Sequence, residues 1–411
     1  MHICMLSREF REGGGGVFTH TRKISRKLID LGNRVTVIAT KNKGEPTLDV
    51  IDGIPVVRVH TTTVPSYFLG TDLYSRATRV FSYCLQAALK LRKIHVQKKF
   101  DVICGQGISG FAGALFKLMC SLPLVIRTAW PYIGIKNICL SERGNSIDRI
   151  KIEATHFPLI IMDKLACTSA EKVTALSKSL AYEISKGYNI PYERIEIIPN
   201  GINVKEYENV ACDEIKEKYN LWDTINVLFV GRINQRKGVD YLIDAIPKVL
   251  HSVKNIRFLL VGSGNTTFYK RRARELGIEQ YINFVGHVSH KDVNKYYASA
   301  DIFILPSLYE GMPFVVLEAM AAGKPVISTN IAGIPDIINN GHTGFLIDPK
   351  DVNAIAKYII MLTKNEKLRK NVGNNGKEHV KKFFNIENVS KRLLSVFEQT
   401  IMLHNKKKEL I

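Results

Sequence analysis

No stretch of this 411-residue chain is apolar for long enough to span a membrane. Its longest apolar window, 105–126, is interrupted by Lys117 and Pro123, whereas a spanning helix needs about 20 mostly apolar residues. No signal peptide is recognisable, because His2–Leu6 already has the composition of a first β-strand. We therefore expect a cytoplasmic protein, either free or peripheral at the cytoplasmic face of the membrane.

The cysteines show no pairing pattern. There are seven, an odd number, and none forms a CxxC motif. Most lie in apolar runs, as Cys4, Cys84, Cys104 and Cys167 do, which predicts small buried hydrophobic residues in a reducing cytosol. The chain also lacks a DxD motif and any His, Cys or carboxylate spacing typical of a metal site. We therefore expect no metal and no cofactor.

Acidic residues are scarce relative to basic ones. The chain has 58 Lys and Arg against 38 Asp and Glu, a formal net charge of +20. The excess is spread out, with 28 against 16 in residues 1–200 and 30 against 22 in residues 201–411. Such a balance favours anionic partners, namely nucleotide phosphates, acidic lipid headgroups or nucleic acid. Because no recognised nucleic-acid-binding motif is present, we do not expect nucleic acid.

A dinucleotide-binding fingerprint is also missing. The glycine run 13–16 follows the first predicted strand and precedes a helix, as phosphate-binding loops do. The GxGxxG pattern, however, would need glycine where Phe18 stands, and no acidic residue ends the second strand at Ala39-Thr40. The run is therefore either a flexible turn or a place where a ligand approaches the backbone too closely for a Cβ.

Apolar strands and amphipathic helices do alternate, in two successive series. This alternation is typical of parallel sheets covered by helices on both faces, an α/β fold. We expect two doubly wound, Rossmann-like domains, 1–203 and 204–385, followed by a C-terminal helix and basic tail, 386–411. Their binding crevices, at the carboxyl ends of the strands, would face one another across a cleft. The predicted strands are 2–7, 34–39, 54–59, 101–105, 124–128, 172–177, 194–199, 225–230, 257–261, 281–285, 301–305, 326–328 and 344–347.

The segment 298–326 has the pattern strand, loop, helix, loop, strand. Pro313 suits the first helical position and Gly323 suits the helix end. Unpaired N–H groups at such a helix N-terminus favour an anionic ligand. Glu310, just before this helix, would be unfavourable beside a bare phosphate. We therefore expect Glu310 to bind an uncharged group attached to the phosphate, such as a sugar hydroxyl.

Two cations follow the first strand of the second domain. Arg232 ends that strand and Lys237 opens the next helix, so both are expected at the carboxyl edge of the sheet. There they would stabilise a departing diphosphate. The alternative is a pair of solvated surface charges, the usual state of Lys and Arg. Glu310 and Glu318 on the same edge favour the diphosphate site.

The next two strands of this domain end in glycine-containing loops. Gly262 and Gly264 follow one strand, and Gly286 ends the other. His287 is either a general base or a neighbour of backbone amides that bind a nucleobase. We favour the amides around Gly286, His287 and Val288, because one histidine at a strand end is weak support for a base.

With these residues, the chain resembles the retaining GT-B glycosyltransferases of glycosyltransferase family 4, whose second domain is called glycosyl transferases group 1. The resemblance extends over about 1–351 and rests on several motifs in one order. The motifs are Met1–Ser7 with the glycine run 13–16, AEKVTALS at 170–177, IIPNGI at 197–202, GRINQRKG at 231–238, LVGSG at 260–264, FVGHV at 284–288, EGMPFVVLE at 310–318, GKPVI at 323–327, AGIPDII at 332–338 and NGHTGFLI at 340–347.

The resemblance implies a hexosyltransferase-type enzyme that uses a nucleotide-diphosphate sugar as donor. Arg232 and Lys237 would hold the diphosphate. Glu310 would bind the sugar hydroxyls and Glu318 the ribose hydroxyls. Further contacts with the donor or acceptor are implied at Gly14, Gly15, Gly16, Gly286, His287, Val288, Gly311, Met312, Pro313, Phe314 and Val315.

One position departs from the family pattern. Members often have histidine in a T-x-H segment after the fifth strand, where this chain has Thr128-Ala129-Trp130. Trp130 cannot act as a base, so no catalytic histidine is assigned; Trp130 either stacks on a sugar or is a core aromatic residue. Neither carboxylate is a convincing nucleophile. We therefore expect same-face transfer, in which the leaving phosphate takes the proton of the acceptor.

The acceptor is expected to be a glycan or a lipid-linked molecule of cell-surface polysaccharide or glycolipid synthesis. The alternatives are a sugar-nucleotide epimerase, a phosphorylase and an inactive nucleotide-sugar-binding protein on the same scaffold. Basic faces on the helices predicted near 17–31 and 79–99 are either solvated or dock onto an anionic membrane surface.

Overall fold

A computed structural model describes residues 1–11, 15–62, 72–141, 146–289 and 291–409. The chain forms two compact units. Unit 1 comprises residues 1–201 together with 386–411, and unit 2 comprises residues 202–385. The chain thus passes into unit 2 at Ile202, close to the predicted boundary, and its C-terminal helix returns to unit 1.

Unit 1 is built on an eight-stranded sheet with the order β3-β4-β2-β1-β5-β6-β7-β8. All neighbouring strands are parallel except β3 and β4, which pair antiparallel. The strands are β1 (His2–Leu6), β2 (Arg34–Thr40), β3 (Leu48–Ile51), β4 (Ile54–Val59), β5 (Val102–Gln106), β6 (Leu124–Thr128), β7 (Lys172–Ala175) and β8 (Ile195–Ile197). The strand order reverses between β1 and β5, the position where doubly wound sheets bind ligands.

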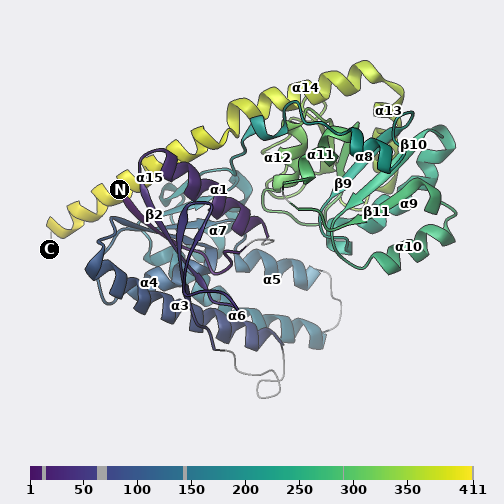
Figure 1. Cartoon of the computed structure of the whole chain (residues 1–411). Coiled ribbons are helices and arrows are strands. Elements are labelled where there is room, and N and C mark those ends of the chain that lie inside the picture. Colours follow the sequence, from purple (N-terminus) through teal and green to yellow (C-terminus); the bar gives the residue numbers. More distant parts are fainter. Residues whose placement is uncertain (12–14, 63–71, 142–145, 290, 410–411) are drawn as a thin grey trace. The chain divides into compact units, whose positions relative to one another are not determined.

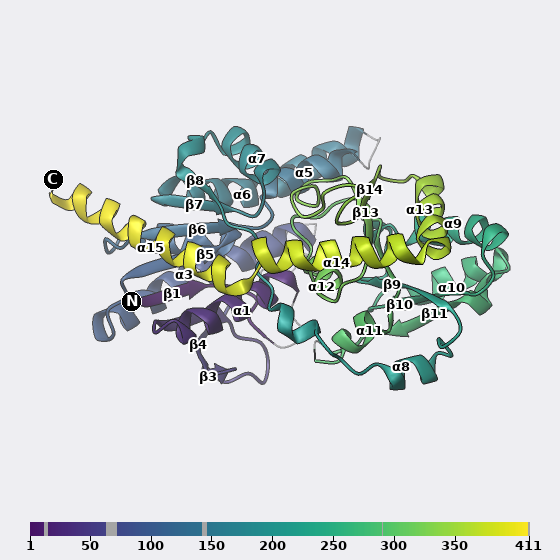
Figure 2. The same ribbon diagram turned by 90° about the horizontal axis from the view of Figure 1, so that it is seen from above.

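Helices cover both faces of this sheet. Figure 1 shows α1 and α15 on one face and α3, α4 and α6 on the other. The helices are α1 (Gly16–Asp30), α3 (Asp72–Gln97), α4 (Phe111–Lys117), α5 (Tyr132–Ser141), α6 (Ser146–Ser169), α7 (Lys178–Tyr188) and α15 (Ile386–Glu409), with short 3-10 turns η1 (Gly107–Gly110) and η2 (Tyr192–Arg194). In the view from above, α15 lies over the central strands of the sheet (Figure 2).

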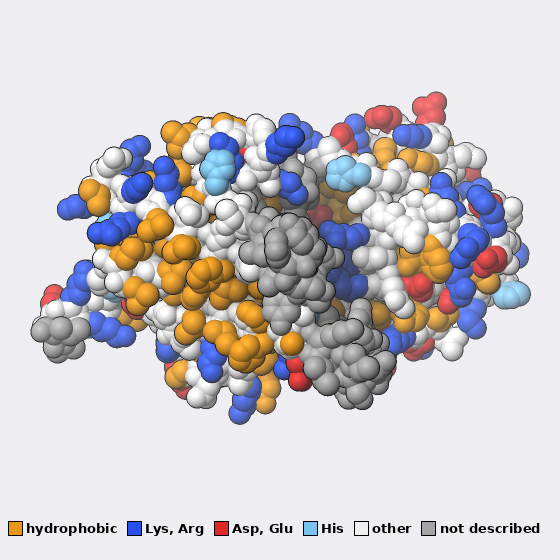
Figure 3. Space-filling view, turned by 90° about the horizontal axis from the view of Figure 1, so that it is seen from below, with side chains coloured by type: hydrophobic (Ala, Val, Ile, Leu, Met, Phe, Trp, Pro, Cys, Tyr) orange, Lys and Arg blue, Asp and Glu red, His pale blue; other side chains and the backbone are white. Residues whose placement is uncertain are grey.

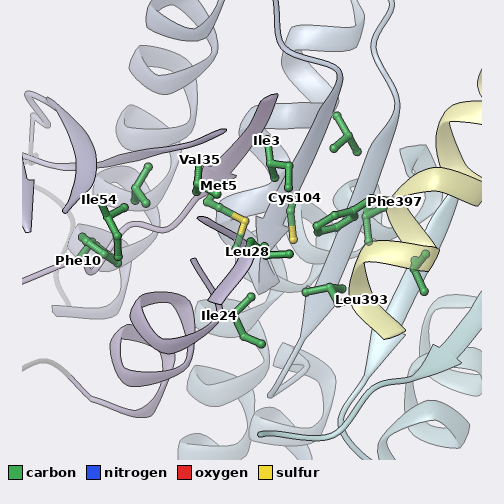
Figure 4. Packing of buried hydrophobic residues seen from close by; sticks show 14 of the residues in the cluster. Ile3, Met5, Phe10, Ile24, Leu28, Val35, Ile54, Cys104, Leu393 and Phe397 are labelled. Atoms are coloured by element: carbon green, nitrogen blue, oxygen red, sulfur yellow. The ribbon is translucent and has the colours of Figure 1, made fainter. Parts of the chain in front are cut away.

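The core of unit 1 joins the sheet to α1 and α15 (Figure 4). Ile3 of β1 and Leu28 of α1 are fully buried in it, as are Leu393 and Phe397 of α15. Cys104 of β5 lies in the same cluster as a free thiol, which confirms the predicted burial of this cysteine. The C-terminal helix is therefore an integral part of unit 1.

Unit 2 has a six-stranded, wholly parallel sheet with the order β11-β10-β9-β12-β13-β14. Numbered within this unit, the order is 3-2-1-4-5-6, that of a dinucleotide-binding domain, and it reverses between β9 and β12. The elements are η3 (Val204–Tyr207), α8 (Asp213–Lys218), β9 (Ile225–Val230), η4 (Gln235–Lys237), α9 (Val239–Ser252), β10 (Ile256–Val261), α10 (Thr266–Glu275), η5 (Glu279–Tyr281), β11 (Ile282–Gly286), α11 (Val293–Ser299), β12 (Ile302–Leu305), α12 (Phe314–Ala321), β13 (Val326–Thr329), β14 (Phe345–Ile347), α13 (Val352–Lys364) and α14 (Glu366–Phe383).

The predicted α/β fold with two doubly wound domains is confirmed. Among the described residues, no helix combines the length and apolar character needed to cross a bilayer.

Candidate active site

The predicted charged residues of unit 2 gather at the carboxyl end of its sheet. Arg232 and Lys237 lie in the segment after β9, and Glu310 lies in the loop after β12. Because β9 and β12 are hydrogen-bonded neighbours on either side of the reversal in strand order, both loops open at the same point.

Glycines let the ends of β9, β10 and β11 approach closely. The N–H of Gly231 donates to Val261 O (2.9 Å), and the N–H of Gly262 donates to Gly286 O (2.8 Å). A Cβ at Gly262 would lie 1.8 Å from Gly231 O, and one at Gly264 would lie 2.1 Å from Ile233 O. Both positions therefore require glycine, and the predicted gathering of glycines at this edge is confirmed.

A short turn carries Lys237 toward the loop after β12. Asn234 Oδ1 accepts from the N–H of Lys237 (3.1 Å) and thereby caps η4. Gly238 follows with φ of +72°, and a Cβ there would lie 1.8 Å from Pro306 O. The turn after β9 is thus packed against the backbone at the end of β12.

This packing brings Lys237 and Glu310 into a nearly buried ion pair. Lys237 Nζ donates to Glu310 Oε1, and Ser307 Oγ donates to the same oxygen (2.8 Å). The side chains of Lys237 and Glu310 are 16% and 7% exposed. From the sequence, Lys237 is expected to bind the diphosphate and Glu310 sugar hydroxyls, and their direct contact was not predicted. At such low exposure, either charge alone would be strongly destabilising.

Arg232 differs from Lys237 in its surroundings. It is exposed, and no hydrogen bond or ion pair joins it to any residue that the structure describes. Its guanidinium is therefore available for an anion, for which its planar set of donors is well suited.

Glu318 occupies a more buried position than the sequence implied. It lies in α12 and is only 3% exposed. Tyr297 of α11 donates its hydroxyl to Glu318 Oε2 (2.9 Å), and the ring of Tyr207 in η3 packs edge-on against that of Tyr297. Burial, together with the Glu318 charge, raises the pKa of Tyr297 well above its usual value, so this phenol stays protonated as a donor. The two tyrosines are far from Glu318 in sequence and were not predicted.

The loop before α12 is also largely buried. Gly311, Met312 and Pro313 are buried, whereas Phe314 and Val315 are half-buried. Pro313 is the N-cap of α12, so the helix starts at Phe314, one position later than predicted. On the edge strand of the sheet, Gly286 ends β11 with φ of +86° and is followed by exposed His287 and half-buried Val288. No hydrogen bond to another described residue orients the His287 ring, so nothing favours its use as a base.

In unit 1, Gly14 lies outside the described residues. Gly15 and Gly16 are exposed at the N-terminus of α1, and a Cβ at either would meet nothing within 4 Å. Among the described residues, nothing requires glycine at either position. Trp130 is half-buried shortly after β6.

A buried arginine of unit 1 was not predicted. Arg127 of β6 is 1% exposed and donates to Ile198 O (2.9 Å), Pro199 O (3.0 Å) and Asn200 Oδ1 (3.3 Å). Burial lowers the pKa of Arg127 to about 10. Burial and this nearby cation lower the pKa of His20 in α1, whose ring nitrogens have no hydrogen bond within the described part of the chain. The signal in the sequence that could have identified both Arg127 and His20 was an arginine within an otherwise apolar strand.

Within the described ranges, no group of three His, Cys, Asp or Glu residues is arranged to hold a metal ion.

Comparison with known proteins shows the family of the chain. Residues 213–379 match the family described as glycosyl transferases group 1, and residues 14–206 match the one described as glycosyltransferase family 4. An uncharacterized glycosyltransferase of Methanocaldococcus jannaschii is 30% identical over 409 residues, 97% of this chain and 98% of that protein. The capsular polysaccharide biosynthesis glycosyltransferase CapM of Staphylococcus aureus is 29% identical over 322 residues, 76% of this chain and 80% of CapM.

Among solved structures, Anabaena HepE in complex with UDP and glucose has the same fold. The TM-score is 0.75 at 19% identity, and the match covers 97% of this chain and 100% of HepE.

Proposed function

Because the chain belongs to glycosyltransferase family 4 and is a GT-B glycosyltransferase, we propose that it transfers a sugar from a nucleotide-diphosphate sugar to a glycan or lipid-linked acceptor. The observation that carries this proposal is that the Lys237–Glu310 pair and the exposed Arg232 both follow strands at the switch point of unit 2.

Arg232 and Lys237 bind the diphosphate of the donor. As the bond from the sugar to the phosphate breaks, negative charge grows on the leaving diphosphate, and two fixed cations stabilise it more than they stabilise the intact donor. Because these cations neutralise the diphosphate, the reaction needs no divalent metal. Chelation by EDTA should then leave the turnover rate unchanged.

Glu310 binds the hydroxyls of the donor sugar. One of its oxygens is shared by Lys237 and Ser307, and the carboxylate retains further acceptor sites on the other oxygen. Lys237 thus bridges the carboxylate that holds the sugar and the diphosphate that leaves it. Glu318, held by Tyr297, binds the ribose hydroxyls from within α12.

The sugar is transferred with retention of configuration, by same-face attack. Glu310 is engaged by Lys237 and Ser307, and Glu318 by Tyr297, so neither is placed as a free nucleophile. The leaving phosphate accepts the proton of the acceptor hydroxyl. Acceptor recognition is assigned to unit 1, and CapM suggests a growing surface polysaccharide as the acceptor class.

The first experiment identifies the donor. Uridine, guanosine and adenosine diphosphate sugars are screened by thermal shift; a ligand at 100 times its Kd adds about 2.7 kcal/mol of stability. UDP-glucose is a suitable first probe, since HepE was solved with UDP and glucose. Acceptor-dependent release of the nucleoside diphosphate then separates a transferase from an epimerase or an inactive binding protein.

The second experiment tests the diphosphate role. Arg232→Ala should lower the transfer rate at saturating donor by about 10²-fold. Arg271→Ala on α10, which removes an arginine whose side chain is 69% exposed, is the matched control and should keep the full rate. A full transfer rate in Arg232→Ala would refute the role of Arg232.

A further inference from the structure

Two helices of unit 1 expose apolar side chains in regular rows. Phe81, Leu85 and Leu89 of α3 are 48%, 41% and 42% exposed. Phe157, Ile161 and Leu165 of α6 are 63%, 39% and 44% exposed. The residues of each row are four positions apart, so each row lies along one side of its helix. We call these six residues the apolar face.

The two rows belong to one surface. Helices α3 and α6 pack against one another, and both pack against α4. Figure 3 shows hydrophobic side chains gathered on the side of unit 1 where these helices lie, with Lys and Arg side chains near its edge. Leu118, just after α4, is 84% exposed as well.

The fold does not need this exposed row on α3. The opposite side of the helix supplies the core contacts, with Val80, Tyr83, Cys84 and Leu91 fully buried. The Phe81 ring lies 6.4 Å from that of Phe111, but close to half of the surface of each residue in this row remains in water. Contiguous exposed patches of this kind mark interaction sites.

The charge around the apolar face is strongly basic. Residues 76–99 contain seven Lys and Arg and no Asp or Glu. Arg92 follows Phe81 by about three helical turns and so lies in the apolar row itself. Arg92 and Lys93 are exposed, and within the described residues no ion pair neutralises either. Glu153 is the exposed acidic residue of the described part of α6.

The other basic helix of unit 1 behaves differently. On α1, Arg22 pairs with Asp52 (2.6 Å), Arg26 with Asp30 (3.2 Å), and Lys27 with Glu387 (3.6 Å). Its cations are therefore largely neutralised within the protein. Of the two basic helices that the sequence singled out, α3 alone combines unneutralised cations with exposed apolar side chains.

We propose that the apolar face docks onto an anionic lipid surface. The Phe and Leu side chains enter the boundary between headgroups and acyl chains, and the cations of α3 contact the lipid phosphates. The positive charge around the apolar face favours a lipid surface over a second copy of this chain as the partner. Two copies joined through this face would bring like charges together, whereas an anionic bilayer complements them. The docking involves unit 1 alone and does not depend on the proposed transfer reaction.

Vesicle co-sedimentation of the full chain, without donor or acceptor, tests this proposal. Vesicles of phosphatidylcholine with about 30% phosphatidylserine are tested first. They should bind the chain at least about tenfold more tightly than vesicles of pure phosphatidylcholine. The Phe81→Gln/Leu85→Gln/Leu89→Gln variant should bind at least about tenfold more weakly, because glutamine keeps helix propensity but removes the apolar area. Arg92→Gln/Lys93→Gln should weaken binding about 25-fold, or fivefold for each charge.

Matched controls lie elsewhere on the surface. Leu48→Gln/Val50→Gln removes two exposed apolar residues of β3, and Lys270→Gln/Arg271→Gln removes two exposed cations of α10. Both control variants should bind vesicles like the unchanged chain. Circular dichroism and thermal unfolding verify that every variant is folded.

Three results would overturn the proposal. The first is equal binding to anionic and neutral vesicles. The second is unaltered vesicle binding by a folded Phe81→Gln/Leu85→Gln/Leu89→Gln variant. The third is a concentration-dependent dimer in sedimentation velocity that this variant abolishes, without any vesicle binding, which would assign the face to a second copy of the chain.

Discussion

The carboxyl ends of the two sheets carry different polar groups. At the end of the unit 2 sheet, Lys237 pairs with Glu310 and Arg232 is exposed. At the end of the unit 1 sheet, Arg127 is buried and bonded to backbone carbonyls and an amide oxygen. Both cations lie near the ends of parallel strands. The difference shows that a cation at a strand end marks a site only when its partners leave it accessible to a ligand.

The largest effect is expected at the ion pair of unit 2. Lys237→Met should lower turnover by about 10²- to 10³-fold and the unfolding free energy of unit 2 by roughly 3 kcal/mol, because Glu310 is left buried without a cation. The double variant Lys237→Met/Glu310→Gln should regain most of the stability and none of the turnover. Initial rates with saturating donor and urea unfolding measure the two effects.

The matched control is a partly buried pair of unit 1, in which Lys117 Nζ lies 2.5 Å from Glu171 Oε1. Lys117→Met should lower stability and leave turnover per folded molecule unchanged. If Lys237→Met/Glu310→Gln recovered turnover, the pair of unit 2 would be structural, like that of unit 1.

A pH dependence of stability is expected in unit 1, where a carboxyl group is buried without a cation. Asp163 accepts from Tyr188 Oη (2.5 Å) and from the N–H of Tyr132 (3.1 Å), and burial raises the pKa of its side chain from 3.8 to about 6. The folded state therefore holds this proton more tightly than the unfolded chain. The contribution to stability is present below about pH 4 and is lost as the pH rises through about 6, a change of about 3 kcal/mol.

The two tryptophans permit the measurement in each unit separately. Trp130 reports on unit 1 in a Trp222→Phe background, and Trp222 reports on unit 2 in a Trp130→Phe background. Asp163→Asn, which can accept the same two bonds, should remove the dependence seen by Trp130. An unchanged slope in that variant would refute the role of Asp163.

Arg127→Met tests whether the buried cation of unit 1 is structural. The carbonyls of Ile198 and Pro199 would lose their donor, which should cost about 2 kcal/mol of unfolding free energy. Turnover per folded molecule should stay within about threefold of that of the unchanged chain. Such a change is much smaller than the loss expected when a catalytic hydrogen-bond donor is removed. A loss of 10²-fold or more in a folded variant would instead place Arg127 in the catalytic machinery.

The sheet of unit 2 was predictable because buried parallel strands are continuous apolar runs. Every predicted strand of that unit lies within one residue of the observed bounds at each end. The strand β3 was missed, since it is an antiparallel edge strand whose Leu48 and Val50 face solvent. Helix α6 was missed because its apolar residues lie on two sides and Pro158 interrupts its pattern.

The candidate site was predictable where motifs follow strand ends, as with Arg232 and Glu310. Contacts between distant segments were not. The bond from Lys237 to Glu310 depends on how closely Gly238 packs on Pro306, which spacing along the chain does not encode. The exposed row of α3 was overlooked because one apolar side already accounted for the core.

The smallest expected effect concerns Tyr297, which holds Glu318 within unit 2. Tyr297→Phe removes one hydrogen bond to a buried carboxylate and should weaken donor binding by about 1–2 kcal/mol, or about tenfold in KM, with kcat unchanged. KM rises and kcat stays unchanged if Glu318 binds the ribose equally strongly in the ground state and in the transition state. Tyr269→Phe, which removes a comparable bond to Asp240 (3.0 Å), is the control and should leave KM unchanged. An equal fall in kcat and kcat/KM would mean that Glu318 acts on the reacting bond, which would bring its role close to that of the Lys237–Glu310 pair.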